Sequence, residues 1–149
     1  MDFKELVSDF AARHGIEGLA AEDGVAALEV DGIAVALAEI GGDLVATAVI
    51  GDPPAEGRAD FADLLLSYNL ESEAFFAKSG ESGRYMLCRR VALAVLDGKA
   101  FDSMLEYLLN TAENWRHLLA DYRPAAEAAA RAAAEDDSDL ASGGGFLQV

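Results

Sequence analysis

The alternation of hydrophobic and polar residues changes its period along the chain, and each period predicts a different kind of element. Between residues 3 and 14 the apolar positions recur at helical spacing. Asp2 precedes this stretch as a predicted N-cap, Glu5 follows three positions later, and Gly15 marks the stop. We therefore expect an N-terminal helix over residues 3–14.

A strand pattern follows this helix and predicts three strands, at residues 25–30, 33–40 and 44–50. Asp31-Gly32 separates the first two strands and is the strongest hairpin signal in the chain. Gly41-Gly42 provides a second tight turn. Because both connections are tight, we expect the three strands to be antiparallel neighbours in a meander.

In the second half of the chain the hydrophobic pattern again changes from helical spacing to strand alternation. A helix is predicted over about residues 56–70, followed by strands at residues 74–78 and 84–90 around a Ser-Gly-Glu-Ser-Gly turn. Asp97 is the predicted N-cap of a last helix. One continuous apolar face marks that helix: Phe101, Met104, Leu105, Leu108, Ala112, Trp115, Leu119 and Tyr122.

The order of elements predicts the class of fold. Helix, three-strand meander, helix, β-hairpin and helix indicate an α+β fold in which helices cover an antiparallel sheet. A length of 149 residues suits one such domain with a tail. We expect the domain at residues 1–123, and an alanine-rich, acidic and glycine-rich tail at residues 124–149.

The charge of the chain narrows the range of partners. It holds 27 acidic and 11 basic residues, a formal net charge of −16. A surface this acidic repels phosphate groups, so nucleic acid and anionic membranes are poor partners. A single cysteine, no signal-peptide pattern and no apolar run long enough to span a bilayer favour the cytoplasm.

Residues suited to catalysis or metal binding form no recognisable motif. His14 and His117 each lie in a predicted helix without a second His or Cys at ligand spacing. Cys88 lies within a predicted strand, where a buried thiol is expected to be inert. The sequence has neither a phosphate-binding loop nor a nucleophile elbow. We therefore predict a protein that is not an enzyme and holds no metal or cofactor.

The second predicted helix carries more apolar surface than one helix–sheet contact needs. A helix that is apolar over most of its circumference has to bury two sides. Burial within its own domain is one interpretation, and self-association is the interpretation that we favour. The predicted dimer interface consists of Phe61, Leu64, Leu65, Tyr68 and Leu70, and Leu66 widens the stripe.

Three short segments carry a resemblance to a known family. They are LLSYNL at residues 65–70, LCRR at residues 87–90 and NTAENW at residues 110–115. Together with the order of elements, the small size and the acidic charge, they resemble the class I type III secretion chaperones, the CesT/Tir chaperone family. The resemblance covers about residues 1–122, and it does not extend to the tail.

The resemblance implies a cytoplasmic homodimer that binds the extended N-terminal segment of a secreted effector, without ATP or metal. Binding would keep the effector soluble and competent for export. The second helix corresponds to the dimer helix of the family. The ATPase of the secretion apparatus is a further candidate partner. The implied effector-binding residues are Phe3, Leu6 and Phe10 of the first helix and Val35 and Leu37 of the meander.

Two other functions remain open at this point. A small enzyme or ligand-binding domain on the same α+β scaffold would need a polar cleft, which the sequence does not indicate. A chaperone-like adaptor would join folded proteins and never handle an unfolded segment. Binding assays with N-terminal effector fragments and with folded partners distinguish the adaptor from the chaperone.

The end of the chain gives one more prediction. Gly143, Gly144 and Gly145 form a linker sequence that precedes three apolar residues between 146 and 149. Simple disorder is one interpretation of such an end. A tethered apolar tip also meets a groove of its own protein at high effective concentration. We therefore predict that residues 146–149 occupy an effector-binding groove while no effector is bound.

Overall fold

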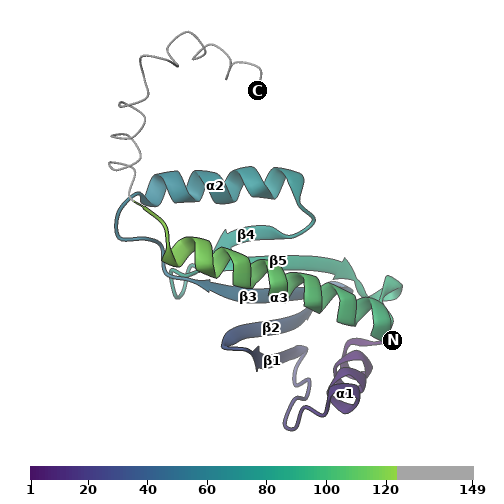
Figure 1. Cartoon of the computed structure of the whole chain (residues 1–149). Coiled ribbons are helices and arrows are strands. Elements are labelled where there is room, and N and C mark those ends of the chain that lie inside the picture. The colour runs from purple at the N-terminus through teal and green to yellow at the C-terminus, as the bar shows by residue number, and fades with distance from the viewer. Residues whose placement is uncertain (124–149) are drawn as a thin grey trace, which may run out of the picture.

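The computed structural model describes residues 1–123 of the chain (Figure 1). The tail predicted at residues 124–149, and the docking predicted for residues 146–149, lie outside the described residues. The helices and strands follow the predicted order. They are α1 (Phe3–His14), β1 (Val25–Val30), β2 (Ile33–Ile40), β3 (Asp43–Gly51), α2 (Arg58–Glu71), β4 (Phe75–Lys78), β5 (Tyr85–Ala92), the short 3₁₀ helix η1 (Leu93–Val95) and α3 (Gly98–Ala120).

The five strands form one antiparallel sheet in the order β1-β2-β3-β5-β4. β1 and β2 are joined by the predicted hairpin, in which Asp31 and Gly32 have φ angles of 50° and 81°. A positive φ at both central positions is the geometry of a type I′ turn, which matches the twist of the strands. The predicted α+β fold with an antiparallel meander is confirmed.

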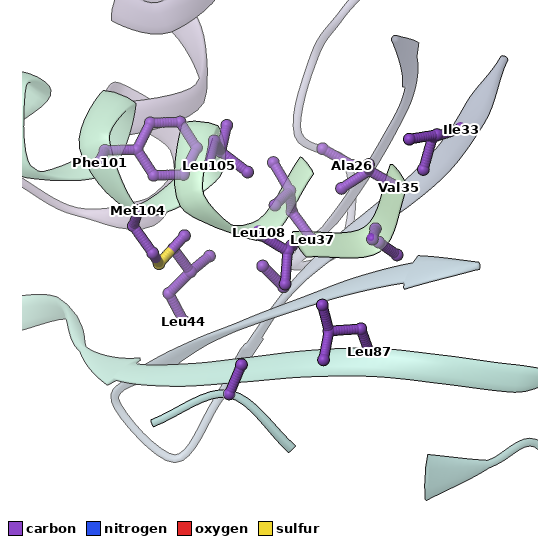
Figure 2. Close-up of a cluster of buried hydrophobic side chains, with 14 of the residues drawn as sticks. Ala26, Ile33, Val35, Leu37, Leu44, Leu87, Phe101, Met104, Leu105 and Leu108 are labelled. Atoms are coloured by element: carbon purple, nitrogen blue, oxygen red, sulfur yellow. The ribbon is translucent and has the colours of Figure 1, made fainter. Parts of the chain in front are cut away.

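The main core lies between the sheet and the two helices α1 and α3, which lie on one face of it (Figure 1). Side chains along β2 and β3 alternate between buried and more exposed positions, as a sheet covered on one face requires. Figure 2 shows the apolar side of α3 meeting the inward side chains of the strands. Among these residues are Ala26, Ile33, Val35, Leu37, Leu44, Leu87, Phe101, Met104, Leu105 and Leu108.

Local signals account for the ends of the first two helices. Asp2 and Glu5 form the predicted capping box at the start of α1, and Gly15 ends that helix with a φ of 64°. α2 begins at Arg58, two residues later than predicted. Gly57 precedes it with a φ of 71°, a left-handed conformation that the helix cannot include.

Charged side chains hold the end of α1 against the start of α3. Arg13 Nε lies 2.7 Å from the Asp9 carboxylate, and Arg13 Nη2 donates to Asp102 of α3 at 3.0 Å. The same nitrogen donates to the Gly98 carbonyl at 3.2 Å. A Cβ atom on Gly98 would lie 2.8 Å from the Asp9 carboxylate, so glycine permits this close approach.

Candidate protein-binding site

A cluster of aromatic side chains joins α2 to the β4 end of the sheet and to the end of α3. The Phe61 ring stacks on Tyr85 with a centroid distance of 5.8 Å and meets Tyr122 edge-on at 5.0 Å. Trp115 lies 6.2 Å from Phe61 and 5.5 Å from Tyr68. These contacts bury the inner side of α2. The cluster consists of Phe61, Tyr68, Phe76, Tyr85, Trp115 and Tyr122.

One side chain of α2 blocks part of the β4 edge of the sheet. The Asn69 amide donates to the Phe76 carbonyl at 3.1 Å, and its oxygen accepts from the Phe76 N–H at 2.5 Å. Because N–H and C=O of one residue point to the same side of an antiparallel strand, both groups of Phe76 face away from β5. Asn69 therefore occupies the place that another strand would take beside Phe76. The other outward residue of β4, Lys78, has no backbone partner on this side within residues 1–123.

The outward side of α2 is apolar and exposed. Leu64, Leu66 and Leu70 have exposed fractions of 50%, 65% and 88%. A groove of about 500 Å³ lies between this helix and β4. Exposed leucines beside an apolar groove are typical of a protein–protein contact. The groove is lined by Arg58, Ala59, Ala62, Leu65, Leu66, Phe76, Ala77, Lys78 and Tyr85.

The opposite edge of the sheet, at β1, is open. Alternate residues of β1 direct their backbone groups towards β2, and the residues between them direct theirs outward. Of the outward residues, Val25 exchanges two backbone hydrogen bonds with Glu22. Ala27 and Glu29 have no backbone partner on this side within residues 1–123. A hollow of about 290 Å³ borders them, lined by Ile16, Glu17, Gly18, Leu19, Ala27, Leu28 and Glu29.

The residues predicted for the dimer interface divide between the two sides of α2. Phe61 and Leu65 are 1% and 4% exposed and pack in the core of their own chain. Tyr68 is partly buried beside them. Leu64 and Leu70 lie on the exposed side. The structure thus leaves only these two of the predicted residues fully available to a second copy.

The residues predicted for effector binding all lie in the core. Each of them is at most 8% exposed, and they meet on the face of the sheet that α1 and α3 cover. Of these residues, Phe10 also lines a hollow beside the β1–β2 hairpin. The part of all five in effector binding stays a prediction. They are Phe3, Leu6, Phe10, Val35 and Leu37.

Leu66, Ala27 and Glu29 are among the residues of these surfaces that the predicted interfaces did not include. Leu66 belongs to the widened apolar stripe of α2, and it lies on the exposed side of that helix. Ala27 and Glu29 contribute backbone groups at a strand edge, and a sequence pattern does not show which strand lies at an edge. Hairpin signals placed β1 beside β2 but did not exclude a further neighbour.

The described residues bring together no cluster of metal ligands. Among residues 1–123 no three His, Cys, Asp or Glu side chains converge as metal ligands would. Burial raises the pKa of the Cys88 thiol, so it reacts more slowly at neutral pH. Hydrogen bonding to Ser72 lowers the pKa of Tyr107. No helix in this part of the chain is long and apolar enough to cross a bilayer.

Comparison with known families gives a match over most of the domain. The model of the Tir chaperone protein (CesT) family matches residues 5–116. The chain belongs to this family. The predicted resemblance is therefore confirmed: the chain is a type III secretion chaperone, and its family is one of chaperones and not of enzymes. No curated protein sequence matches this chaperone.

Solved structures share the fold of the chaperone. A chain of the ExsC–ExsE complex is 26% identical, with a TM-score of 0.71; the match covers 80% of this chain and 97% of that one. A chain of the HopA1–SchA chaperone–effector complex is 18% identical, with a TM-score of 0.66 and coverages of 77% and 93%. A chain in the structure of the Yersinia pestis type III secretion chaperone SycH with a YscM2 fragment is 24% identical, with a TM-score of 0.62 and coverages of 76% and 99%. The last two similarities concern the fold alone.

Proposed function

We propose that this chaperone binds an extended N-terminal segment of a secreted effector in the cytoplasm and keeps it soluble and competent for export. The observation that carries the proposal is the edge of β1, where Ala27 and Glu29 direct outward backbone groups that have no partner within residues 1–123. An extended segment adds to such an edge by main-chain hydrogen bonds, which do not depend on its side chains. This mode suits a protein that receives an unfolded segment.

The surroundings of β1 support the same mode of binding. Alternate side chains of an added strand point to opposite faces of the sheet. On one side they meet the hollow that includes Ile16, Leu19 and Leu28, which supplies apolar contact. A folded partner cannot place backbone groups along the edge unless it has an exposed strand of its own. The edge therefore favours a chaperone over an adaptor between folded proteins.

We further propose that two copies associate through the outward side of α2. Leu64, Leu66 and Leu70 supply exposed apolar area, and the groove between α2 and β4 lies beside them. Asn69 occupies the outward backbone groups of Phe76 on β4, so contact there depends mainly on side chains. The related HopA1–SchA structure is a chaperone–effector complex, which accords with a binding surface left free elsewhere.

The proposal is tested by removing one outward N–H from β1. Ala27→Pro deletes a donor that no described residue uses, and Ala27→Ser is the matched control because it retains the N–H. N-terminal fragments of secreted proteins from the same genome are co-expressed, and the affinity of the fragment that co-purifies is measured by calorimetry. We expect about tenfold weaker binding for Ala27→Pro, from one lost hydrogen bond and a perturbed edge. Equal affinities in both variants would place the binding segment elsewhere.

A further inference from the structure

A second hollow lies beside the β1–β2 hairpin, between the end of α1 and the middle of α3. Its volume is about 340 Å³, which suffices for one or two large side chains of a peptide. Phe10, Ile33, Leu105 and Leu109 supply its apolar lining. The Phe10 ring packs edge-on against Phe101 at 5.1 Å, which fixes this side of the hollow. We call it the hairpin cleft.

The charged residues that line the hairpin cleft are almost all acidic. Asp31, Glu106 and Glu113 lie around it with Asp102, and the one group that can carry a positive charge is His14. His14 Nε2 already lies 3.2 Å from Asp102, which also binds Arg13. Within residues 1–123 no ion pair involves Asp31 or Glu106. Asp31 and Glu106 therefore bring negative charge to the cleft without a paired cation among the described residues.

The surrounding part of the protein adds to this charge. Residues 1–57, which include α1 and β1–β3, hold 12 acidic residues against two basic ones, Lys4 and Arg13. Arg13 is bound to Asp9, Asp102 and Gly98, and is not free to compensate the cleft. Charges of one sign around a concave apolar surface attract the opposite charge and repel their own.

The hairpin cleft is also continuous with the open strand edge. Ala27 and Glu29 lie along β1, and the next residues of the hairpin, Val30 and Asp31, line the cleft. A segment that adds to β1 thus has one end next to the cleft. An apolar side chain at that end enters the cleft, and the residues flanking it lie near the acidic groups.

From these observations we infer that the hairpin cleft selects effector segments in which an apolar anchor is flanked by lysine or arginine. The inference rests on the proposed function, and it adds the chemistry of the segment. Apolar anchors alone distinguish poorly between unfolded segments. Unpaired acidic groups around the anchor site add a preference for basic flanks and exclude acidic ones.

The test uses three fluorescein-labelled peptides with the same two leucine anchors and with lysine, glutamine or glutamate at the flanking positions. Binding to the full-length chaperone is followed by fluorescence anisotropy. At about 50 mM salt we expect the lysine peptide to bind five- to tenfold more tightly than the glutamine peptide, from two or three exposed charge pairs. The glutamate peptide is expected to bind most weakly. At about 500 mM salt the preference should fall below about twofold because the charges are screened.

Matched variants then locate the preference. The double variant Asp31→Asn/Glu106→Gln removes two charges from the cleft, and Glu56→Gln/Glu81→Gln removes two charges from exposed positions outside it. Asparagine adopts the left-handed conformation of Asp31 as readily as aspartate does, so the hairpin is retained. We expect the first variant to lose most of the preference for lysine and the second to keep it.

Each alternative result has a distinct meaning. Equal binding of the three peptides, weakened in each case by Ala27→Pro, would overturn the inference and leave the proposed function intact. No binding of the lysine peptide at about 1 mM would also overturn it, whereas the co-purification of effector fragments decides the proposed function by itself. An equal loss of preference in both double variants would assign it to the overall charge and overturn the role of the cleft.

Discussion

At one edge of the sheet β4 lies beside α2 and its backbone is bonded to Asn69, whereas at the other edge Ala27 and Glu29 of β1 have no backbone partner among the described residues. The part of the chain that contains β1 is also more acidic than the part that contains β4. Residues 1–57 hold 12 acidic and two basic residues, and residues 58–123 hold ten acidic and eight basic ones. One sheet thus has a partly blocked edge with little net charge and an open, strongly acidic edge.

This difference separates two kinds of contact. An open strand edge accepts any extended chain, including another copy of the same edge, and therefore carries a risk of aggregation. The bonds from Asn69 to Phe76 hinder strand addition at β4, so side chains define most of the contact at α2. A high negative charge near β1 opposes pairing between two copies of that edge. An unfolded segment of opposite charge is still accepted there.

The largest expected effect concerns the partly blocked side. Leu66→Asp with Leu70→Asp places two carboxylates on the outward face of α2, where a dimer contact would bury them unpaired. We expect the dimer to weaken by at least about 100-fold, and the fold of the single chain to persist because both leucines are exposed. Light scattering measures the mass, and Leu118→Asp on α3 is the control. A wild-type protein that is monomeric at micromolar concentration would contradict the prediction.

The helices and strands were largely predictable from the sequence. Which apolar faces are covered by the chain itself and which stay exposed was not. The period of the pattern predicted all three helices, the meander and the hairpin, because each element has local signals such as the Asp31-Gly32 turn and the Asp2 cap. The apolar stripes of α1 and β2 correctly indicated burial. They did not reveal that Phe10 and Leu37 are buried by their own chain, because periodicity identifies an apolar face and not the surface that covers it.

The role of Asn69 shows a second limit. The residue lies in the LLSYNL segment that carried the family resemblance, yet nothing in that segment indicates that an amide reaches Phe76 seven positions later. Whether the outward backbone groups of Ala27 and Glu29 have partners depends on the order of strands in the sheet. That order requires knowing that β5 pairs with β3, a contact about 40 residues apart in the sequence.

An intermediate effect is expected when the partly blocked edge is opened. Asn69→Leu removes both hydrogen bonds to Phe76 and leaves a partly buried N–H and C=O without partners. We expect the free energy of unfolding to fall by about 1–3 kcal/mol. The freed edge should also promote further association, visible as mass growing with concentration. Chemical denaturation measures the first effect, and Asn114→Leu on the exposed side of α3 should change stability by less than about 0.5 kcal/mol.

The smallest effect is expected at the ion pairs that hold α1 near the open edge. Hydrogen bonding to Arg13 lowers the pKa of the Asp102 carboxyl below its usual value. A carboxyl whose pKa is lower in the folded than in the unfolded state stabilises the fold at pH values above the unfolded pKa, which is about 3.9. This contribution is lost as the pH falls through the folded pKa. Because the groups are partly exposed, Asp102→Asn should cost less than about 1 kcal/mol at pH 7, and a smaller amount at pH ~3, below the unfolded pKa.

Denaturation of the wild type, Asp102→Asn and the exposed control Asp63→Asn at both pH values measures this difference. A small cost means that α1 is held beside the open edge by the buried side chains of Phe3, Leu6 and Phe10, with the charges adding orientation. A cost above about 2 kcal/mol at neutral pH would mean the reverse, that the α1 side of the sheet depends on its ion pairs. High salt would then loosen the open edge while leaving the aromatic cluster at the partly blocked edge in place.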